Sequence, residues 1–174
     1  NGNYTLIEKK VVIEGQKTAY FSEKFLEITV PVTTKEQIKE IKKTVTHIAK
    51  KHDEEPYKAL ATTQQAIFHQ LEEQDEIDAA AIFDKVFEEK PLAREAAQLA
   101  ITEERIPEKI AVTNVPKYER KYSKQKFKLD NGIEITIPSE IYENKEMVEF
   151  INNPDGSVSV LIKNIESILN KFNA

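Results

Sequence analysis

The spacing of apolar residues changes along this chain, and that change constrains the fold more than any other feature. Between residues 33 and 106 apolar side chains recur at helical intervals, whereas in the C-terminal third they alternate with polar ones. Residues 4–30 are rich in Val, Ile, Tyr, Phe and Thr around a Gly15-Gln16 turn, which is typical of strands. We therefore predict an α+β fold: N-terminal strands, a central layer of about four helices, and a C-terminal antiparallel sheet of two hairpins with a closing helix.

Three regions follow from this change of spacing. They are the N-terminal strands at 1–32, the helical region at 33–106, and the C-terminal sheet and helix at 107–174. With 40% hydrophobic residues the chain can bury a shared core, so we expect one compact unit. Because the chain begins at Asn1 without a start methionine, we also expect a fragment of a longer protein.

The first long helix is predicted from about Lys35 to Lys51. Thr33, followed three residues later by Glu36, has the spacing of a capping box. Five apolar residues share one stripe of this helix and are expected to pack inward: Ile38, Ile41, Val45, Ile48 and Ala49. The adjoining side is basic and carries Lys35, Lys39, Lys42, Lys43 and Lys50. These lysines are candidates for tracking a DNA backbone, although a plain amphipathic surface explains them equally well.

Three more helices are predicted in the central layer. One runs from Tyr57 to about Glu73, the next follows Asp75, and the last begins at Pro91, a residue favoured in the first turn, and ends near Glu104. The predicted inward-facing residues are Leu60, Ile67, Phe68 and Leu71 in the first of these, and Ile77, Ala81, Ile82, Val86 and Phe87 in the second.

Turn chemistry decides the register of the first C-terminal hairpin. A two-residue Asn131-Gly132 loop would mix apolar and polar side chains on each face. A three-residue loop, Asp130-Asn131-Gly132 with a left-handed glycine, instead pairs Phe127 with Ile135 and Lys128 with Glu134. We predict the three-residue loop.

The second hairpin follows the same logic. A three-residue Pro154-Asp155-Gly156 loop sets Phe150 opposite Val160 and Val148 opposite Ile162. The two hairpins are expected to form one sheet. Residues 164–172 then have the spacing of the closing helix.

Composition excludes several classes of protein. The formal net charge is −5, and from 72 to 90 eight carboxylates stand against two lysines, a local balance of −6, so any attraction to DNA must come from local patches. Without cysteine, and with three scattered histidines, disulfide, thiolate and most zinc chemistry is excluded. His69 with Glu72 and Glu73 lacks a second histidine. No glycine-rich phosphate loop or nucleophile elbow occurs.

These exclusions predict a protein that is not an enzyme and that has no metal, cofactor or evident small-molecule substrate. No stretch approaches the ~20 apolar residues of a membrane span, and no secretion signal opens the chain. We therefore expect a cytoplasmic location without membrane partners.

One basic segment stands out from this acidic background. Between residues 117 and 128 six bases stand against Glu119, a net of +5: Lys117, Arg120, Lys121, Lys124, Lys126 and Lys128. Cations of this kind neutralise phosphates, and the interleaved Tyr118, Tyr122 and Phe127 are candidates for stacking on bases. The alternative is a solvated strand edge, where lysines discourage edge pairing. Lysine rather than arginine dominates both basic segments, so any binding is expected to be largely non-specific.

Several motifs of the C-terminal region together carry a family resemblance. They are Phe127–Ile135, Ile137-Pro138, Val148–Val160 and Ile162–Ile165. This set resembles the C-terminal region of the bacterial 37-kDa nucleoid-associated protein family, and Tyr20–Leu26 with the helices after it resembles the middle of such proteins. The resemblance covers most of this chain and about the latter half of a typical member. It implies association with the bacterial nucleoid, through DNA or DNA-bound proteins, and supplies no catalytic residues.

Two hypotheses of function follow. The first is a nucleoid-associated module in the cytoplasm that binds DNA through the lysine-rich faces. The second is a protein-interaction or dimerisation module that does not contact DNA and uses its apolar helices or an exposed sheet edge.

Overall fold

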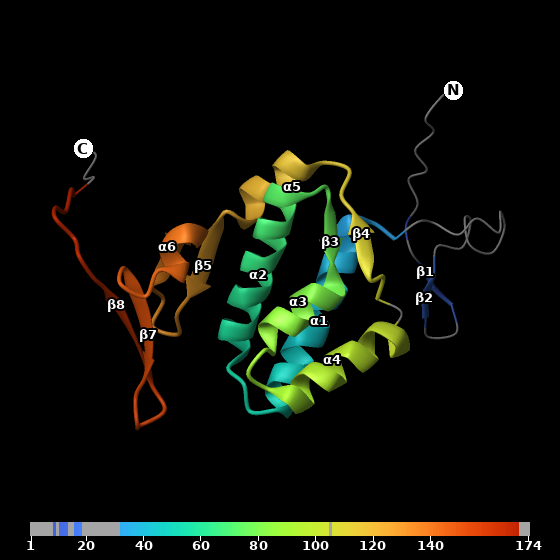
Figure 1. Ribbon diagram of the computed structural model, residues 1–174, viewed down its shortest axis with the longest axis horizontal. Helices are drawn as coiled ribbons and strands as arrows, with labels where there is room; N and C mark the ends of the chain where they lie inside the picture. The colour runs from blue at the N-terminus through green and yellow to red at the C-terminus, as the bar shows by residue number, and fades with distance from the viewer. Residues whose placement is uncertain (1–8, 10, 14–15, 19–31, 105, 171–174) are drawn as a thin grey trace.

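The computed structural model describes residues 9, 11–13, 16–18, 32–104 and 106–170 of the chain (Figure 1). The predicted α+β class is confirmed: these residues form six helices and four two-stranded antiparallel sheets. Of the predicted N-terminal strands, the structure describes β1 (Val11–Ile13) paired with β2 (Gln16–Thr18). The rest of that prediction lies outside the described residues.

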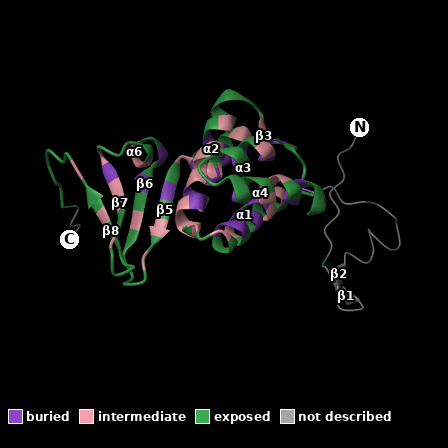
Figure 2. Ribbon diagram, turned by 60° about the horizontal axis from the view of Figure 1, so that its bottom comes forward, coloured by how far each residue is buried: buried purple, intermediate pink, exposed green. Residues whose placement is uncertain are grey.

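The core is a layer of four helices, as predicted. They are α1 (Thr34–Lys51), α2 (Pro56–Glu73), α3 (Ala79–Val86) and α4 (Pro91–Glu103). The capping box opens α1, since the Thr33 hydroxyl accepts from the Glu36 backbone N–H and the Glu36 carboxylate accepts from that of Thr33. All five residues of the predicted apolar stripe on α1 are buried (Figure 2). This orientation leaves the lysine-bearing side of α1 in solvent.

A short ribbon that we did not predict joins the helical layer to the C-terminal third. Strand β3 (Glu76–Asp78) pairs with β4 (Lys109–Ala111), and Ile77 faces Ile110 in the core. Ile77 faces inward as predicted, but from a strand rather than from the third helix. The prediction that Ala81 faces inward is wrong, since Ala81 is exposed. Helix α3 begins after Asp78 because its carboxylate accepts from the Ala81 N–H at 2.9 Å.

The basic segment divides into a helix and a strand. Helix α5 (Val115–Tyr122) holds its first half and strand β5 (Lys124–Lys128) its second half. Helix α5 is an element that we did not predict. The helix forms because the Asn114 side chain caps it by accepting from the Lys117 N–H at 3.2 Å, and Pro116 suits its first turn.

Both C-terminal hairpins have the predicted register. In the first, β5 pairs with β6 (Glu134–Pro138), and Phe127 faces Ile135. In the second, β7 (Val148–Asn152) pairs with β8 (Val158–Ile162), with Phe150 opposite Val160. Each three-residue loop ends in a left-handed glycine, Gly132 at φ +90° and Gly156 at φ +83°. Turn chemistry was therefore sufficient to set both registers.

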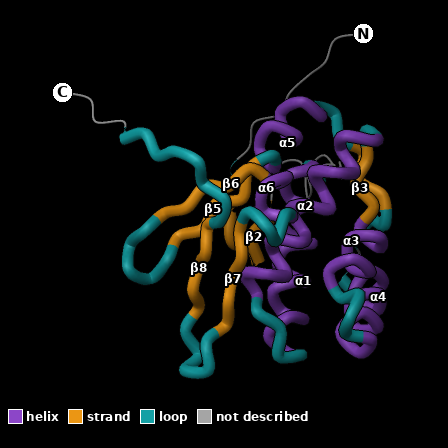
Figure 3. Tube along the Cα trace, turned by 60° about the vertical axis from the view of Figure 1, so that its left-hand side comes forward, coloured by secondary structure: helices purple, strands orange, loops and turns teal. Residues whose placement is uncertain are grey.

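The two hairpins form separate two-stranded sheets rather than the single sheet that we expected. Helix α6 (Ser139–Glu143) lies between them in sequence. It is held to the end of α5, since the Ser139 hydroxyl donates to the Tyr122 carbonyl oxygen at 2.9 Å and the Ser139 N–H donates to that of Ser123 at 2.9 Å. Figure 3 shows the hairpins side by side against one flank of the helices.

The predicted closing helix is wrong. Residues 163–170 have no regular secondary structure, and the remainder of that segment lies outside the described residues. The apolar residues that suggested a helix are exposed: Ile165 at 53%, Ile168 at 85% and Leu169 at 82%. A helix this short is marginal in water without a surface to pack on, and in the described structure these side chains pack on none.

Candidate nucleic-acid interface

Seven lysines from separate segments line one groove. It lies between α1, α2 and the junction of α5 with β5, and its volume is about 950 Å³. We call it the basic groove. Its lysines are Lys35, Lys39, Lys42, Lys43, Lys121, Lys124 and Lys126. All eleven candidate cations named from the sequence are exposed, and the structure brings these seven to one surface.

Hydrogen bonds from polar side chains hold the end of α5 and the strand β5, which form one side of this groove, against α2. The Gln64 Nε2 donates to the carbonyl oxygens of Tyr122 at 3.1 Å and Lys124 at 2.8 Å. In return, the buried Gln125 of β5 donates to the carbonyl oxygen of Ala61 at 3.0 Å. The strand therefore lies along α2 in a fixed position, and its exposed lysines flank those of α1.

Among the described residues, seven lysines and one carboxylate, that of Glu36, line the groove. Lys43 pairs with Glu40 at 3.3 Å, and no described acidic side chain forms an ion pair with any other of the eleven cations. The pKa of Lys121 lies below its ordinary value because of partial burial and, next, the neighbouring charges of Lys42, Lys35 and Lys117. Repulsion of this kind favours a bound anion.

The other four candidates lie outside the basic groove. Lys117 lies near Lys121, and the positive charges of the two lysines repel each other. The Lys117 Nζ stands 5.7 Å from the ring centroid of Tyr118. Lys128 lines the neighbouring pocket. Lys50 in the last turn of α1 and Arg120 in that of α5 line neither.

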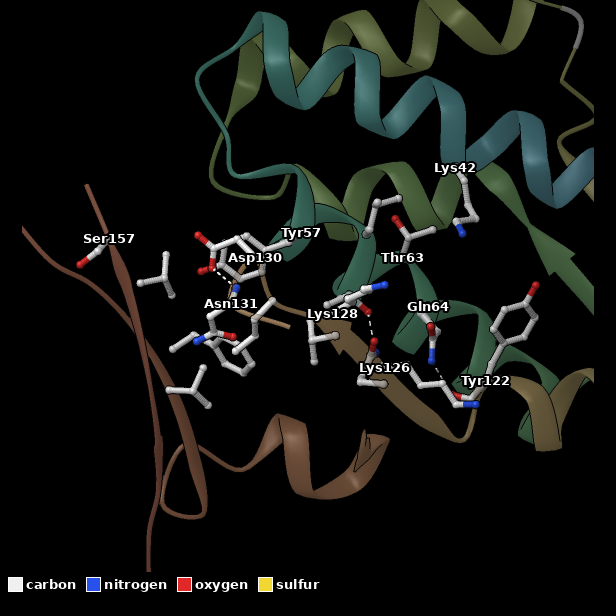
Figure 4. Close-up of a pocket in the computed structure, with 18 of the residues that line it drawn as sticks. Lys42, Tyr57, Thr63, Gln64, Tyr122, Lys126, Lys128, Asp130, Asn131 and Ser157 are labelled. Atoms are coloured by element: carbon white, nitrogen blue, oxygen red, sulfur yellow. Dashed lines mark hydrogen bonds between the residues drawn. The ribbon is translucent and has the colours of Figure 1, made fainter. Parts of the chain in front are cut away.

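A second hollow adjoins the basic groove, between α2 and the two hairpins (Figure 4). We call it the aromatic pocket. Its volume is about 680 Å³, and three half-buried rings line it, those of Tyr57, Phe127 and Phe150. The two hollows share wall residues: Lys42, Leu60, Gln64, Tyr122 and Lys126. Sequence reasoning missed this pocket, since it proposed Phe127 for stacking but gave no signal that Tyr57 and Phe150 lie beside it.

The acidic stretch from 72 to 90 lines neither hollow. Helices α3 and α4 lie on the side of α1 and α2 away from β5 (Figure 3). Some of the nearby acids are paired, Asp84 with Arg94 at 3.7 Å and Glu54 with Lys90 at 3.0 Å. The acids of this stretch therefore lie apart from the lysines of the basic groove.

The two tyrosines beside the groove and pocket stay neutral over the ordinary range of pH. Burial raises the pKa of Tyr122 to about 12, and burial likewise raises that of Tyr142 to about 12, with a smaller contribution from Tyr57.

The imidazole of His69 contacts two carboxylates. Its Nε2 lies 2.5 Å from the Oε1 of Glu143, and its Nδ1 lies 3.3 Å from the Oε2 of Glu72. Within the described ranges, no group of three or more His, Asp or Glu side chains is arranged to hold a metal ion.

The fold and the groove define an α+β protein with a strongly cationic surface on an acidic chain. Comparison with known families matches residues 1–170 to the family described as nucleoid-associated protein YejK. The chain belongs to this family, because the match covers nearly its whole length. No curated protein and no solved structure gives a match.

Membership supports a nucleoid-associated role, and the family is generally non-enzymatic. None of the helices in the described part of the chain is long and apolar enough to cross a membrane.

Proposed function

We propose that this chain binds DNA directly and without sequence specificity through the basic groove, as a non-enzymatic module of the nucleoid. The observation that carries the proposal is the convergence of seven lysines from α1, α5 and β5 on one groove, in a chain whose net charge is −5. Lysines placed in this way neutralise phosphates and release counterions. Nucleoid association of the family supports DNA as the polyanion.

The residues of the groove favour contact with the DNA backbone rather than with base edges. Among the described residues no arginine lines it, and arginine is the usual reader of guanine. Lysine acts as a flexible point charge that binds phosphate without fixing a geometry. Binding through this surface is therefore position-independent along DNA and falls steeply as salt rises.

The test is a fluorescence anisotropy titration of a labelled duplex at two salt concentrations. The double variant Lys42→Glu with Lys121→Glu places two negative charges in the groove and is expected to weaken binding roughly tenfold or more at low salt. Its control is Lys51→Glu with Lys145→Glu, which makes the same change in net charge at exposed lysines outside both hollows. Equal affinity of the two double variants would contradict the proposal.

A second candidate function is self-association, and one specific observation favours it. Apolar side chains are exposed in succession along β7, β8 and the segment that follows: Ile151, Val158, Leu161, Ile162, Ile165, Ile168 and Leu169. Leu161 and Ile162 are successive residues of β8 and point to opposite faces, so both faces of the hairpin offer exposed apolar side chains to a partner. Light scattering of the chain and of the variant Leu161→Ser with Ile168→Ser tests it, since a mass above that of one chain should fall to one chain in the variant.

A further inference from the structure

We infer that the aromatic pocket receives an unpaired base, so that the preferred ligand of this surface is single-stranded nucleic acid rather than an intact duplex. The inference rests on the proposed function, because the phosphates of the strand would lie in the basic groove. It adds the class of nucleic acid and a second binding site, the aromatic pocket.

The walls of the pocket are the first ground for this inference. The rings of Phe127 and Phe150 lie 5.0 Å apart between centroids, and that of Tyr57 lies 5.9 Å from Phe150. These three residues come from α2 and from both hairpins, and each is half-buried. A hollow with aromatic walls accepts flat, apolar faces, and every nucleobase has such a face. Stacking there does not depend on sequence, in keeping with an adjoining groove whose described cationic side chains are all lysines.

The second ground is the connection between the pocket and the groove. Lys42 and Lys126 line both, and Lys128 adds a further cation to the pocket wall. Figure 4 shows these lysines at the side of the pocket nearest α1 and β5. In a nucleotide the phosphate and the base are joined through one sugar. A cationic groove that leads directly into an aromatic hollow therefore matches one strand with its base turned inward.

The third ground is the polar rim. Asn131 lines the pocket from the turn of the first hairpin, and Gln64 lines it from α2. The hydroxyl of Ser157 points away from the pocket in Figure 4 and already donates to Asp155. Amide groups form hydrogen bonds with base edges that are exposed only when the base is unpaired. In a duplex the bases are stacked and paired, and a pocket of about 680 Å³ enclosed by a helix and two hairpins would be reached only by the backbone.

Charge decides between this occupant and a protein segment. An apolar peptide would fill the aromatic pocket but would leave the lysines of the shared wall without a partner. A single strand satisfies both parts at once, because its backbone is anionic and its bases are apolar on their faces. We therefore commit to single-stranded nucleic acid and treat a protein occupant as an outcome of the test.

The test compares one labelled oligonucleotide as a single strand and as a blunt duplex, by anisotropy at low salt. We expect the single strand to bind roughly tenfold more tightly, the size of the effect of stacking one base on an aromatic side chain. The variant Tyr57→Leu should reduce that preference while leaving duplex affinity near that of the parent. Its thermal melt, followed by circular dichroism, shows whether the variant is folded.

A second variant makes the result independent of Tyr57→Leu. The chain contains no tryptophan, so Tyr57→Trp introduces one fluorophore into the pocket wall. Its emission should be quenched by the single strand and much less by the duplex. The matched control is Leu99→Trp, at a position on α4 that is 56% exposed and lines neither hollow; its emission should respond to neither ligand.

The possible failures are distinct. If neither form of DNA binds, the proposed function fails and this inference fails with it. If the duplex binds as tightly as the single strand, or if the indole introduced at position 57 does not respond, the inference alone is overturned. A pocket reserved for a protein segment would give that second result.

Discussion

Gln64 on α2 donates from its Nε2 to the carbonyl oxygen of Lys124 at 2.8 Å and so fixes the first residue of β5 against the helical core. The same nitrogen reaches the carbonyl oxygen of Tyr122 at 3.1 Å. One side chain therefore holds the end of α5 and the start of β5. Because three of the seven lysines of the basic groove come from α5 and β5, Gln64 sets their position relative to the four lysines of α1.

Replacing Gln64 tests this role. Gln64→Leu removes the donor from two carbonyl oxygens, of which that of Tyr122 keeps the Ser139 hydroxyl at 2.9 Å. We expect the free energy of unfolding to fall by about 1–2 kcal/mol, and DNA affinity to fall with it as the two halves of the groove lose their register. Urea denaturation and anisotropy measure the two effects.

The adjacent Gln65 is a matched control. Its Nε2 is buried and has no hydrogen-bond partner among the described residues. Because a buried donor without a partner costs free energy, Gln65→Leu should leave the stability unchanged or raise it. A similar loss of stability in both variants would show that the Gln64 hydrogen bonds are not the cause.

The hairpin turns allow a prediction based on backbone strain. A Cβ added at Gly132 would meet no atom within 4 Å, so its left-handed φ of +90° is the constraint. Gly132→Ala should lower the free energy of unfolding by about 1–2 kcal/mol. Gly132→Asn should cost less, because asparagine tolerates this conformation. Thermal melts of the two variants measure the difference. Equal losses of stability in both variants would mean that the left-handed backbone conformation at position 132 is not the cause.

Local signals predicted much of this fold. The capping box and the apolar stripe placed α1, and the two Asx-Gly turns placed the registers of both hairpins. In each case the residues that decide the structure lie within a few positions of one another. Strand β3 lacked such a signal, because three residues are too few for an alternating pattern, and its partner β4 lies beyond α3 and α4 in the chain.

The candidate site divides in the same way. The charges of the basic groove are visible in the sequence, but their convergence depends on the turn from α5 into β5 and on Gln64, which are tertiary features. The aromatic pocket depends on packing between Tyr57 and the hairpins. The closing helix failed for a related reason: the spacing of Ile165 and Ile168 is helical, but helices need a surface on which to pack.

His69 predicts a pH dependence of stability. The hydrogen bond to Glu143 on α6 is the main cause that raises the pKa of His69 above its ordinary 6.5. Burial opposes this rise, and the charge of Glu143 and then Glu72 on the same helix add to it. A pKa of His69 that is higher in the folded than in the unfolded protein stabilises the fold, and this stabilisation is fully present below pH 6.5. It is lost as the pH rises through the pKa of His69 in the folded protein. The melting temperature should therefore fall between about pH 6 and pH 8.

Variants of the pair show whether His69 is responsible. His69→Gln and Glu143→Gln should each flatten the pH dependence in that window, because each removes the charged hydrogen bond between α2 and α6. His47→Gln, at an exposed position of α1, should retain it. A parent protein whose melting temperature does not change between about pH 6 and pH 8 would contradict the assignment.

The salt dependence of DNA binding counts the lysines that contact phosphate. The slope of the logarithm of affinity against that of salt concentration changes by about 0.9 for each phosphate neutralised. Lys42→Gln with Lys121→Gln should therefore make the slope shallower by about 2, whereas Lys51→Gln with Lys145→Gln should leave it unchanged. Because the positive charges of Lys42 and Lys121 repel each other, neutralising both residues should not lower the melting temperature. A steep slope that survives in the Lys42 and Lys121 variant would place the phosphate contacts elsewhere on the chain.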